Sequence, residues 1–208
     1  MMEPFRTLKA VAAPLLLDNV DTDAIAPASA DSRRLDPDYA RLFFARKRWR
    51  ADGSEDPVFV LNRGPFRTAG ILVTGERFGC GSARETAVWA LQSFGIRCIV
   101  ARSFAEMYRE NCLRNGILPV VLATAEQTAF EDDVVATDGR DAYTIDLHAQ
   151  EIVAPGGRRF AFAIDPADRL VLLEGADLIA LTLRNAGSID AWEAGMRVSQ
   201  PWLQDAGS

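Results

Sequence analysis

The segment "AGILVTGERFGCGSARETAVWALQSFG", residues 69–95, contains the pattern that decides the fold. Its apolar run at 71–75 is typical of a buried strand. Apolar residues then recur on one helical face, at Ala87, Ala90, Leu91 and Phe94. Gly95 follows them as a natural C-terminal cap. The segment therefore predicts a strand, a glycine-rich elbow at 77–86 and a helix, in that order.

The elbow has the features of an anion-binding turn. Gly79 and Gly81 allow a tight turn and a close approach of backbone amides to a ligand, and the following helix directs its N-terminal amides to the same place. Arg84 is suited to hold a carboxylate through two parallel hydrogen bonds. Because Arg84 stands where a third glycine is needed, the dinucleotide-binding fingerprint fails, and no Gly-Lys-Ser/Thr of a P-loop follows. A purely structural turn remains the alternative.

Strands and helices alternate around this segment. Strand-like apolar runs occupy 56–62, 71–75, 97–101 and 117–123. A second helix is expected to begin at Ser103, with Glu106 completing a capping box and Gly116 ending the helix. An antiparallel set follows at 143–147, 151–154 and 158–164, and late helices at 165–177 and 188–196. We predict one domain over residues 1–202 and a frayed tail at 203–208.

Composition limits the classes of function. The hydrophobic fraction of 49% is typical of a globular protein, and the net charge of −6 argues against nucleic-acid binding. No run of about 18 apolar residues suggests a membrane span. The three cysteines, Cys80, Cys98 and Cys112, form neither a disulfide framework nor a CxxC pair, and His148 is the only histidine, so this chain alone favours no metal site. We predict a cytoplasmic protein.

A second polar region is "DNVDTDAIAPA", residues 18–28. Asp18, Asp21 and Asp23 suggest a calcium loop, but the required glycine and glutamate are absent. The alternative is a polar loop between two strands, with Asp21 and Thr22 bonding the local backbone.

Three ordered motifs carry a family resemblance: "NVDTDAIAP", "GERFGCGSARETAVWAL" and "SFAEMYRENCLRNGILPV". Together they resemble the small subunit of 3-isopropylmalate dehydratase, the separately encoded swivelling domain of the aconitase superfamily. The likeness runs from "APLLLDNVDTD" to "LIALTL", nearly the whole chain. It implies an α/β fold of the swivelling β/β/α type, a mixed sheet with flanking helices. It also implies a hydro-lyase of leucine biosynthesis that interconverts 2- and 3-isopropylmalate and is active only with its large subunit.

The resemblance also assigns roles to residues. The superfamily elbow reads Gly-Ser-Ser-Arg-Glu-His; its first serine, the general base, corresponds to Ser82, and its arginine, which holds substrate carboxylates, corresponds to Arg84. The residues that the likeness places around the small dicarboxylate substrate are Gly81, Ala83, Asp21, Thr22 and Asp23, together with Arg33 or Arg34. The 4Fe–4S cluster is expected in the large subunit, with no cofactor bound by this chain, in a heterodimer or heterotetramer.

Two departures leave alternatives open. Ala83 replaces the second serine of the superfamily motif and Thr86 its histidine, and the segment after "IAP" lacks the usual large apolar residue. The alternatives are a related hydro-lyase for another branched malate, such as dimethylmalate or citramalate, and a catalytically decayed anion-binding swivel domain.

Overall fold

The computed structural model describes residues 2–27, 39–176, 182–200 and 202. Its strands form two four-stranded sheets, one parallel and one antiparallel. The expected α/β fold is confirmed, with the parallel and antiparallel strands in separate sheets.

The parallel sheet has the strand order β2-β3-β4-β5. Its strands are β2 (Ala12–Leu15), β3 (Ile71–Thr74), β4 (Cys98–Ala101) and β5 (Leu118–Val120). Leu15 is in register with Thr74, and Thr74 with Ala101, so the first three strands end at one level. The loops that follow these strands therefore gather at one edge of the sheet.

The antiparallel sheet has the order β1-β6-β7-β8. Its strands are β1 (Thr7–Ala10), β6 (Tyr143–Asp146), β7 (Glu151–Val153) and β8 (Arg159–Ala161). This sheet confirms the antiparallel set predicted from the alternating residues. His148 is exposed in the turn between β6 and β7.

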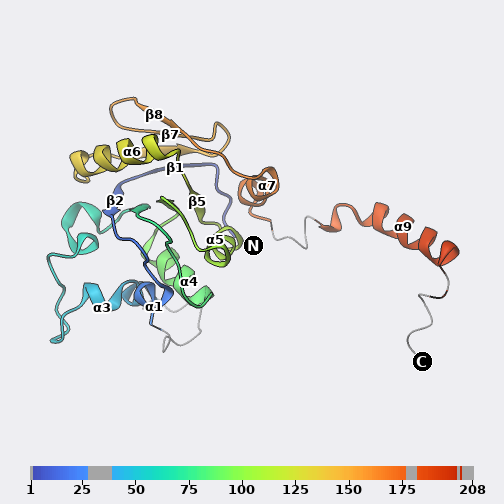
Figure 1. Ribbon diagram of the computed structural model, residues 1–208, viewed down its shortest axis with the longest axis horizontal. Coiled ribbons are helices and arrows are strands. Elements are labelled where there is room, and N and C mark those ends of the chain that lie inside the picture. Colours follow the sequence, from blue (N-terminus) through green and yellow to red (C-terminus); the bar gives the residue numbers. More distant parts are fainter. Residues whose placement is uncertain (1, 28–38, 177–181, 201, 203–208) are drawn as a thin grey trace.

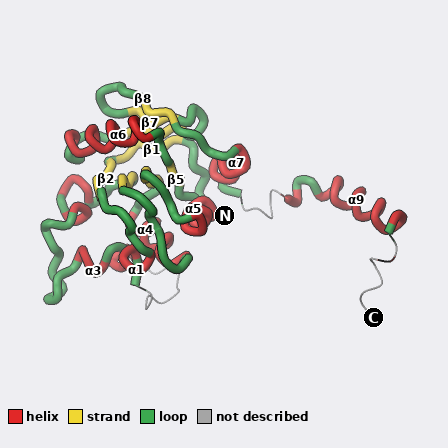
Figure 2. Tube along the Cα trace, viewed as in Figure 1, coloured by secondary structure: helices red, strands yellow, loops and turns green. Residues whose placement is uncertain are grey.

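Helices cover the parallel sheet and connect its strands (Figures 1 and 2). The α-helices are α1 (Thr22–Ile25), α2 (Tyr39–Leu42), α3 (Ala45–Arg48), α4 (Glu85–Phe94), α5 (Glu106–Arg114), α6 (Thr124–Thr137), α7 (Pro166–Glu174) and α9 (Ala186–Ser199). Two 3-10 turns, η1 (Val60–Asn62) and η2 (Gly64–Phe66), precede β3.

Two apolar cores lie on opposite faces of the parallel sheet. Leu72 of β3 packs in one core with residues of α1, α4 and α5, whereas its neighbours Ile71 and Val73 pack in the other. That second core includes Phe130 of α6 and Phe160 of β8. The alternation follows the period of a strand, because successive side chains point to opposite faces. The parallel sheet is therefore the middle layer of the fold, between helices and the antiparallel sheet (Figure 1).

The predicted strand at 71–75, the elbow and the helix after it are confirmed, with Gly95 at φ +111° as the helix cap. The strand predicted at 56–62 is wrong: this segment forms turns and η1. Phe59 instead packs beside α3, with its ring 5.7 Å from that of Phe44, whereas Val58 is exposed.

The capping box predicted at Ser103 is also wrong. Helix α5 begins at Glu106 with Ala105 as its N-cap residue and no side-chain cap. The Ser103 hydroxyl instead accepts a hydrogen bond from the Arg77 amide at 2.8 Å. A contact across the fold therefore replaces the local cap.

Helix α9 stands apart from the two sheets (Figure 1), and none of its residues is buried. Its exposed apolar side chains include Trp192 and Val198. Among the residues that the structure describes, no helix is both long and apolar enough to cross a membrane.

Candidate active site

Three loops meet at the carboxyl edge of the parallel sheet. They follow β2, β3 and β4, and they contain the Asp21–Asp23 segment, the elbow and Ser103 respectively. Backbone hydrogen bonds join them: the Gly79 amide donates to Val20, the Thr22 amide to Cys80, and the Phe78 amide to Ser103. Ligands of open α/β sheets bind at this edge, so the sheet brings the two sequence regions together where a site is expected.

The turn of the elbow depends on left-handed residues. Arg77, Gly79 and Gly81 have φ values of +53°, +77° and +90°. A Cβ on Gly79 would overlap the Tyr108 side chain and lie 2.6 Å from its Cβ, whereas a Cβ on Gly81 would have Asp21 as its nearest neighbour, at 3.6 Å. Gly79 is thus required both by its backbone and by its contact with α5.

Aromatic packing fixes the base of the elbow. Phe78 is fully buried, and its ring lies edge-on to Phe104 at 6.4 Å and to Tyr108 at 5.5 Å between ring centroids. The Ala105 amide donates back to the Phe78 carbonyl. The elbow is therefore anchored to the start of α5 as well as to its own strand.

Above this base, Ser82 and Ala83 are exposed and Arg84 is partly buried. Arg84 is the N-cap residue of α4 but makes no side-chain capping bond, so among the residues that the structure describes the first amides of this ten-residue helix have no side-chain cap. Among the described residues, no backbone carbonyl accepts a hydrogen bond from the amides of Gly81, Ser82 or Ala83. The elbow thus presents backbone donors and the positive end of a helix dipole beside the Ser82 hydroxyl.

Thr22 and Asp23 hold the Arg84 side chain. Its Nη2 donates to Thr22 Oγ1 at 3.2 Å and to Asp23 Oδ1 at 2.8 Å, while its buried Nε has no hydrogen-bond partner among the described residues. The Thr22 hydroxyl donates to the Ser82 carbonyl at 2.8 Å. Because Asp23 is half exposed, its ion pair with Arg84 contributes little free energy and can give way to another carboxylate.

Most of the residues expected at the site are therefore neighbours. The structure brings together Asp21, Thr22, Asp23, Gly81, Ser82, Ala83 and Arg84. Asp21 caps α1 by accepting from the Ala24 amide at 2.6 Å, as the alternative interpretation predicted, although α1 rather than a strand follows this loop. The local bond predicted for Thr22 is wrong, because its hydroxyl donates to the distant Ser82 carbonyl. Arg33 and Arg34 lie outside the described residues.

The sequence prediction missed two residues that support the site. Asp18 accepts a hydrogen bond from the Glu76 amide at 2.7 Å, and Tyr108 packs against Gly79. Asp18 stands in the polar segment at 18–28, but only the fold shows that its carboxylate bonds the loop after β3. Nothing in the sequence around Tyr108 indicates that this residue contacts the elbow.

The cysteines do not offer a ligand set. Cys98 and Cys112 are buried in different layers of the core, and burial raises the pKa of both thiols. Among the described residues, no group of three or more His, Cys, Asp or Glu side chains is placed to hold a metal ion. The residues of the described chain therefore do not fit an iron–sulfur cluster.

Comparisons with known proteins agree with this geometry. The aconitase C-terminal domain family matches residues 2–125, and the family of C-terminal domains from 3-isopropylmalate dehydratase small subunits matches residues 179–206. The chain is 48% identical to the 3-isopropylmalate dehydratase small subunit of Cupriavidus necator, over 97% of this chain and 98% of that protein. It is 46% identical to the small subunit of Azorhizobium caulinodans, over 97% of this chain and all of that protein.

A solved structure supports the same assignment. The 3-isopropylmalate dehydratase of Methanocaldococcus jannaschii matches with a TM-score of 0.62 and 28% identity, over 89% of this chain and 99% of that chain. Fold, coverage and sequence identity point to one family. The chain belongs to the 3-isopropylmalate dehydratase small subunits and contains an aconitase C-terminal domain.

Proposed function

We propose that this chain works as the small subunit of a cytoplasmic hydro-lyase that interconverts 2- and 3-isopropylmalate in leucine biosynthesis. The observation that carries the proposal is the elbow, where Ser82, Arg84 and the uncapped start of α4 occupy one short segment. The relatives named above are small subunits, so a large subunit is needed to complete the enzyme. We assign the iron–sulfur cluster to that large subunit, and the substrate is a small dicarboxylate.

Arg84 is proposed to bind a substrate carboxylate. Its guanidinium is held by Asp23 and Thr22, which orient it at the edge of the elbow. A substrate carboxylate would compete with Asp23 for the same planar donors, which suit a two-bond contact. Thr22 would stay in place, because it is buried and also bonds the Ser82 carbonyl.

Ser82 is proposed to remove a proton from the substrate carbon and to return it in the reverse direction. A serine hydroxyl is a weak base at its ordinary pKa, so this role needs strong stabilisation of the alkoxide. The first amides of α4 and the elbow amides of Gly81, Ser82 and Ala83, which bond no carbonyl in the described ranges, are donors of the required kind. Ala83 adds no hydroxyl here, which leaves Ser82 as the one serine of the elbow.

Reconstitution tests the proposal. The purified chain alone is expected to be inactive, and activity is expected on mixing with a 3-isopropylmalate dehydratase large subunit under anaerobic conditions. The assay should compare 2-isopropylmalate with dimethylmalate and citramalate, because Ala83 differs from the superfamily serine. Preference for another branched malate would assign that compound as the substrate in place of isopropylmalate. Turnover by the metal-free chain alone would contradict the proposal.

Arg84→Lys is expected to raise KM for the substrate about 10- to 100-fold in the assembled enzyme, with a smaller effect on kcat. A lysine keeps the charge but loses the planar pair of donors, and a hydrogen bond to a charged group contributes about 1.5–3 kcal/mol. Steady-state kinetics would measure both constants. Arg77→Lys, at a neighbouring exposed elbow residue, is the control. An unchanged KM in Arg84→Lys would exclude the carboxylate contact.

A further inference from the structure

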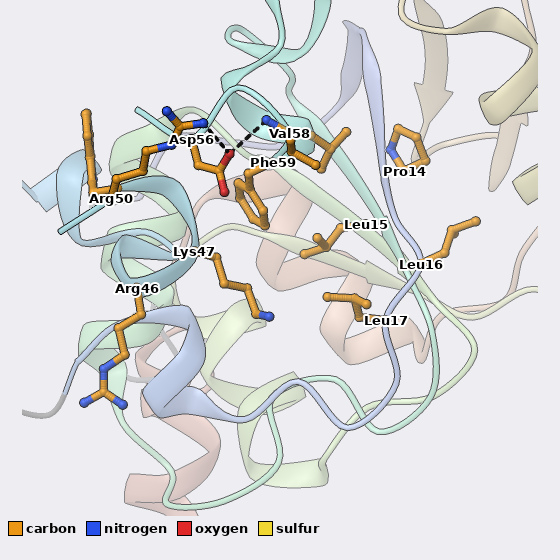
Figure 3. Close-up of a pocket in the computed structure, with 12 residues that line it drawn as sticks. Pro14, Leu15, Leu16, Leu17, Arg46, Lys47, Arg50, Asp56, Val58 and Phe59 are labelled. Carbon is orange, nitrogen blue, oxygen red and sulfur yellow. Dashed lines mark hydrogen bonds and ion pairs between the residues drawn. The ribbon is translucent and has the colours of Figure 1, made fainter. Parts of the chain in front are cut away.

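A groove of about 480 Å³ runs beside the site along the edge strand β2 (Figure 3). One side is formed by Pro14 and the apolar residues Leu15 to Leu17, and the other by α3 and residues 56–60. Leu16, Leu17 and Val58 are 45%, 40% and 82% exposed. Burial of these side chains by another molecule would be favourable, since about 25 cal/mol is gained for each Å² of apolar surface removed from water.

The wall of this groove is preformed. The buried Arg48 side chain on α3 donates to Asn62 Oδ1 at 3.1 Å and to the Ala40 carbonyl at 2.8 Å. Asn62 in turn donates to the carbonyls of Arg48 and Asp56. These bonds fix α3 against the segment that carries Val58, so a ligand does not have to order this wall.

Lys47 places an unpaired positive charge in the groove. Its side chain extends between Phe59 and Leu17, whereas Arg46 points away (Figure 3). Arg50 Nη2 lies 3.7 Å from Asp56 Oδ1. The Lys47 ammonium, in contrast, has no ion-pair or hydrogen-bond partner among the described residues, and only the backbone amide of Lys47 is bonded, to the Phe44 carbonyl. An ammonium that becomes covered by apolar groups needs a carboxylate beside it, because an unpaired buried charge is costly.

The groove adjoins the site. The Leu17 carbonyl accepts from the Gly75 amide at 3.1 Å and from Thr74 Oγ1 at 3.2 Å, directly before the elbow. Helix α3, which carries Lys47, contacts α1, which carries Thr22 and Asp23. A large subunit that closes over the elbow therefore has the groove within the adjoining surface.

Resting on the proposed function, we propose that this groove is a docking site for the large subunit. Its occupant is a surface segment of the large subunit that presents an apolar side chain next to an Asp or Glu carboxylate. The apolar side chain covers Leu16, Leu17 and Val58, and the carboxylate pairs with Lys47. The pair sets the position of the two subunits as well as their affinity.

Charge reversal at Lys47 tests this assignment. The chain contains two lysines, and the other, Lys9, is exposed on β1 of the antiparallel sheet. Increasing amounts of the chain are added to a fixed amount of large subunit, and activity is measured under anaerobic conditions. Lys47→Glu is expected to raise the half-saturating concentration about 30-fold or more, with unchanged kcat at saturation. Lys9→Glu is the matched control and should behave as the wild type.

Lysine acetylation gives a second readout that does not depend on turnover. In the free chain both lysines should react with an acetylating reagent, and in the assembled complex Lys47 should be protected while Lys9 still reacts. Val58→Asp should weaken assembly in the same titration, because it places a carboxylate in the apolar part of the groove. Circular dichroism would verify that each variant is folded.

The outcomes separate this inference from the proposed function. An active complex in which Lys47 stays reactive, or in which Lys47→Glu assembles normally, overturns the docking site alone. A complex that protects Lys47 but has no turnover supports docking and contradicts the catalytic proposal. A dimer of the chain alone that Lys47→Glu dissociates would assign the groove to a second copy and overturn the inference.

Discussion

Ser82→Ala is expected to lower kcat of the assembled enzyme by about 10²–10⁴-fold, the usual effect of removing a general base. KM should change little, because the exposed hydroxyl adds little to binding of the ground state, whereas Arg84 and the elbow amides remain. The backbone should also remain, since Thr22 bonds the Ser82 carbonyl rather than its side chain. The measurement is kcat and KM at a saturating concentration of large subunit.

Ser93→Ala is the matched control, because Ser93 is an exposed serine on α4, the helix that follows the elbow. It should leave both constants unchanged. Assembly of the Ser82→Ala complex, measured by sedimentation, must equal that of the wild type. A kcat close to the wild-type value would contradict the assignment of the base, and the elbow would then serve only as an anion cradle.

Gly79→Ala is expected to lower the free energy of unfolding by about 2–4 kcal/mol. The added methyl meets the Tyr108 side chain, and overpacking of this kind costs about 1–3 kcal/mol. The backbone at φ +77° adds strain, because a residue with a Cβ rarely adopts this conformation. Urea denaturation monitored by fluorescence would measure the loss.

Two other glycines separate these causes. Gly157 has φ +85° and open space around its added methyl, so Gly157→Ala measures the backbone strain alone. Gly156 has neither a positive φ nor a close neighbour, so Gly156→Ala should be nearly neutral. If Gly79→Ala were no worse than Gly157→Ala, the Tyr108 contact would have no part in fixing the elbow.

The elbow could be predicted because its causes are local. A strand-length apolar run, two closely spaced glycines and apolar residues at helical spacing each act within a few residues. Together they allow few backbone conformations. The prediction that the elbow and the DTD segment lie close together came from the family resemblance rather than from the residues themselves. Their contacts, such as the bond from Thr22 to Ser82, join positions 60 residues apart.

The elements that were predicted wrongly depend on contacts between residues far apart in the sequence. Ser103 stands three positions before Glu106, as a capping box requires, but its hydroxyl bonds the Arg77 amide instead. Residues 56–62 have a strand-like composition, yet they form turns and η1, and Phe59 packs against Phe44 at the start of α3. Helix α6 was not predicted, because its buried positions include the polar residues Gln127 and Glu131, which interrupt the helical periodicity of apolar residues in the sequence.

Other expectations stay predictions. The single domain over residues 1–202 and the 203–208 tail were predicted from the length and composition of the chain. The roles of Ser82 and Arg84 rest on the family resemblance and await the proposed experiments. Residues 203–208 also lie outside the described residues.

The backbone hydrogen bonds between the elbow and its neighbouring loops have a consequence for the rate of turnover. Backbone bonds from Gly79, Thr22 and Phe78 tie the elbow to both adjacent loops, and Phe78 is locked between aromatic rings. The amide protons of Gly79, Thr22 and Phe78 should therefore exchange slowly although they lie in loops, whereas those of Gly81, Ser82 and Ala83 should exchange fast. The three loops should therefore move together, as one rigid unit, when substrate enters or product leaves. Such motions take microseconds to milliseconds, which places product release among the steps that can set kcat.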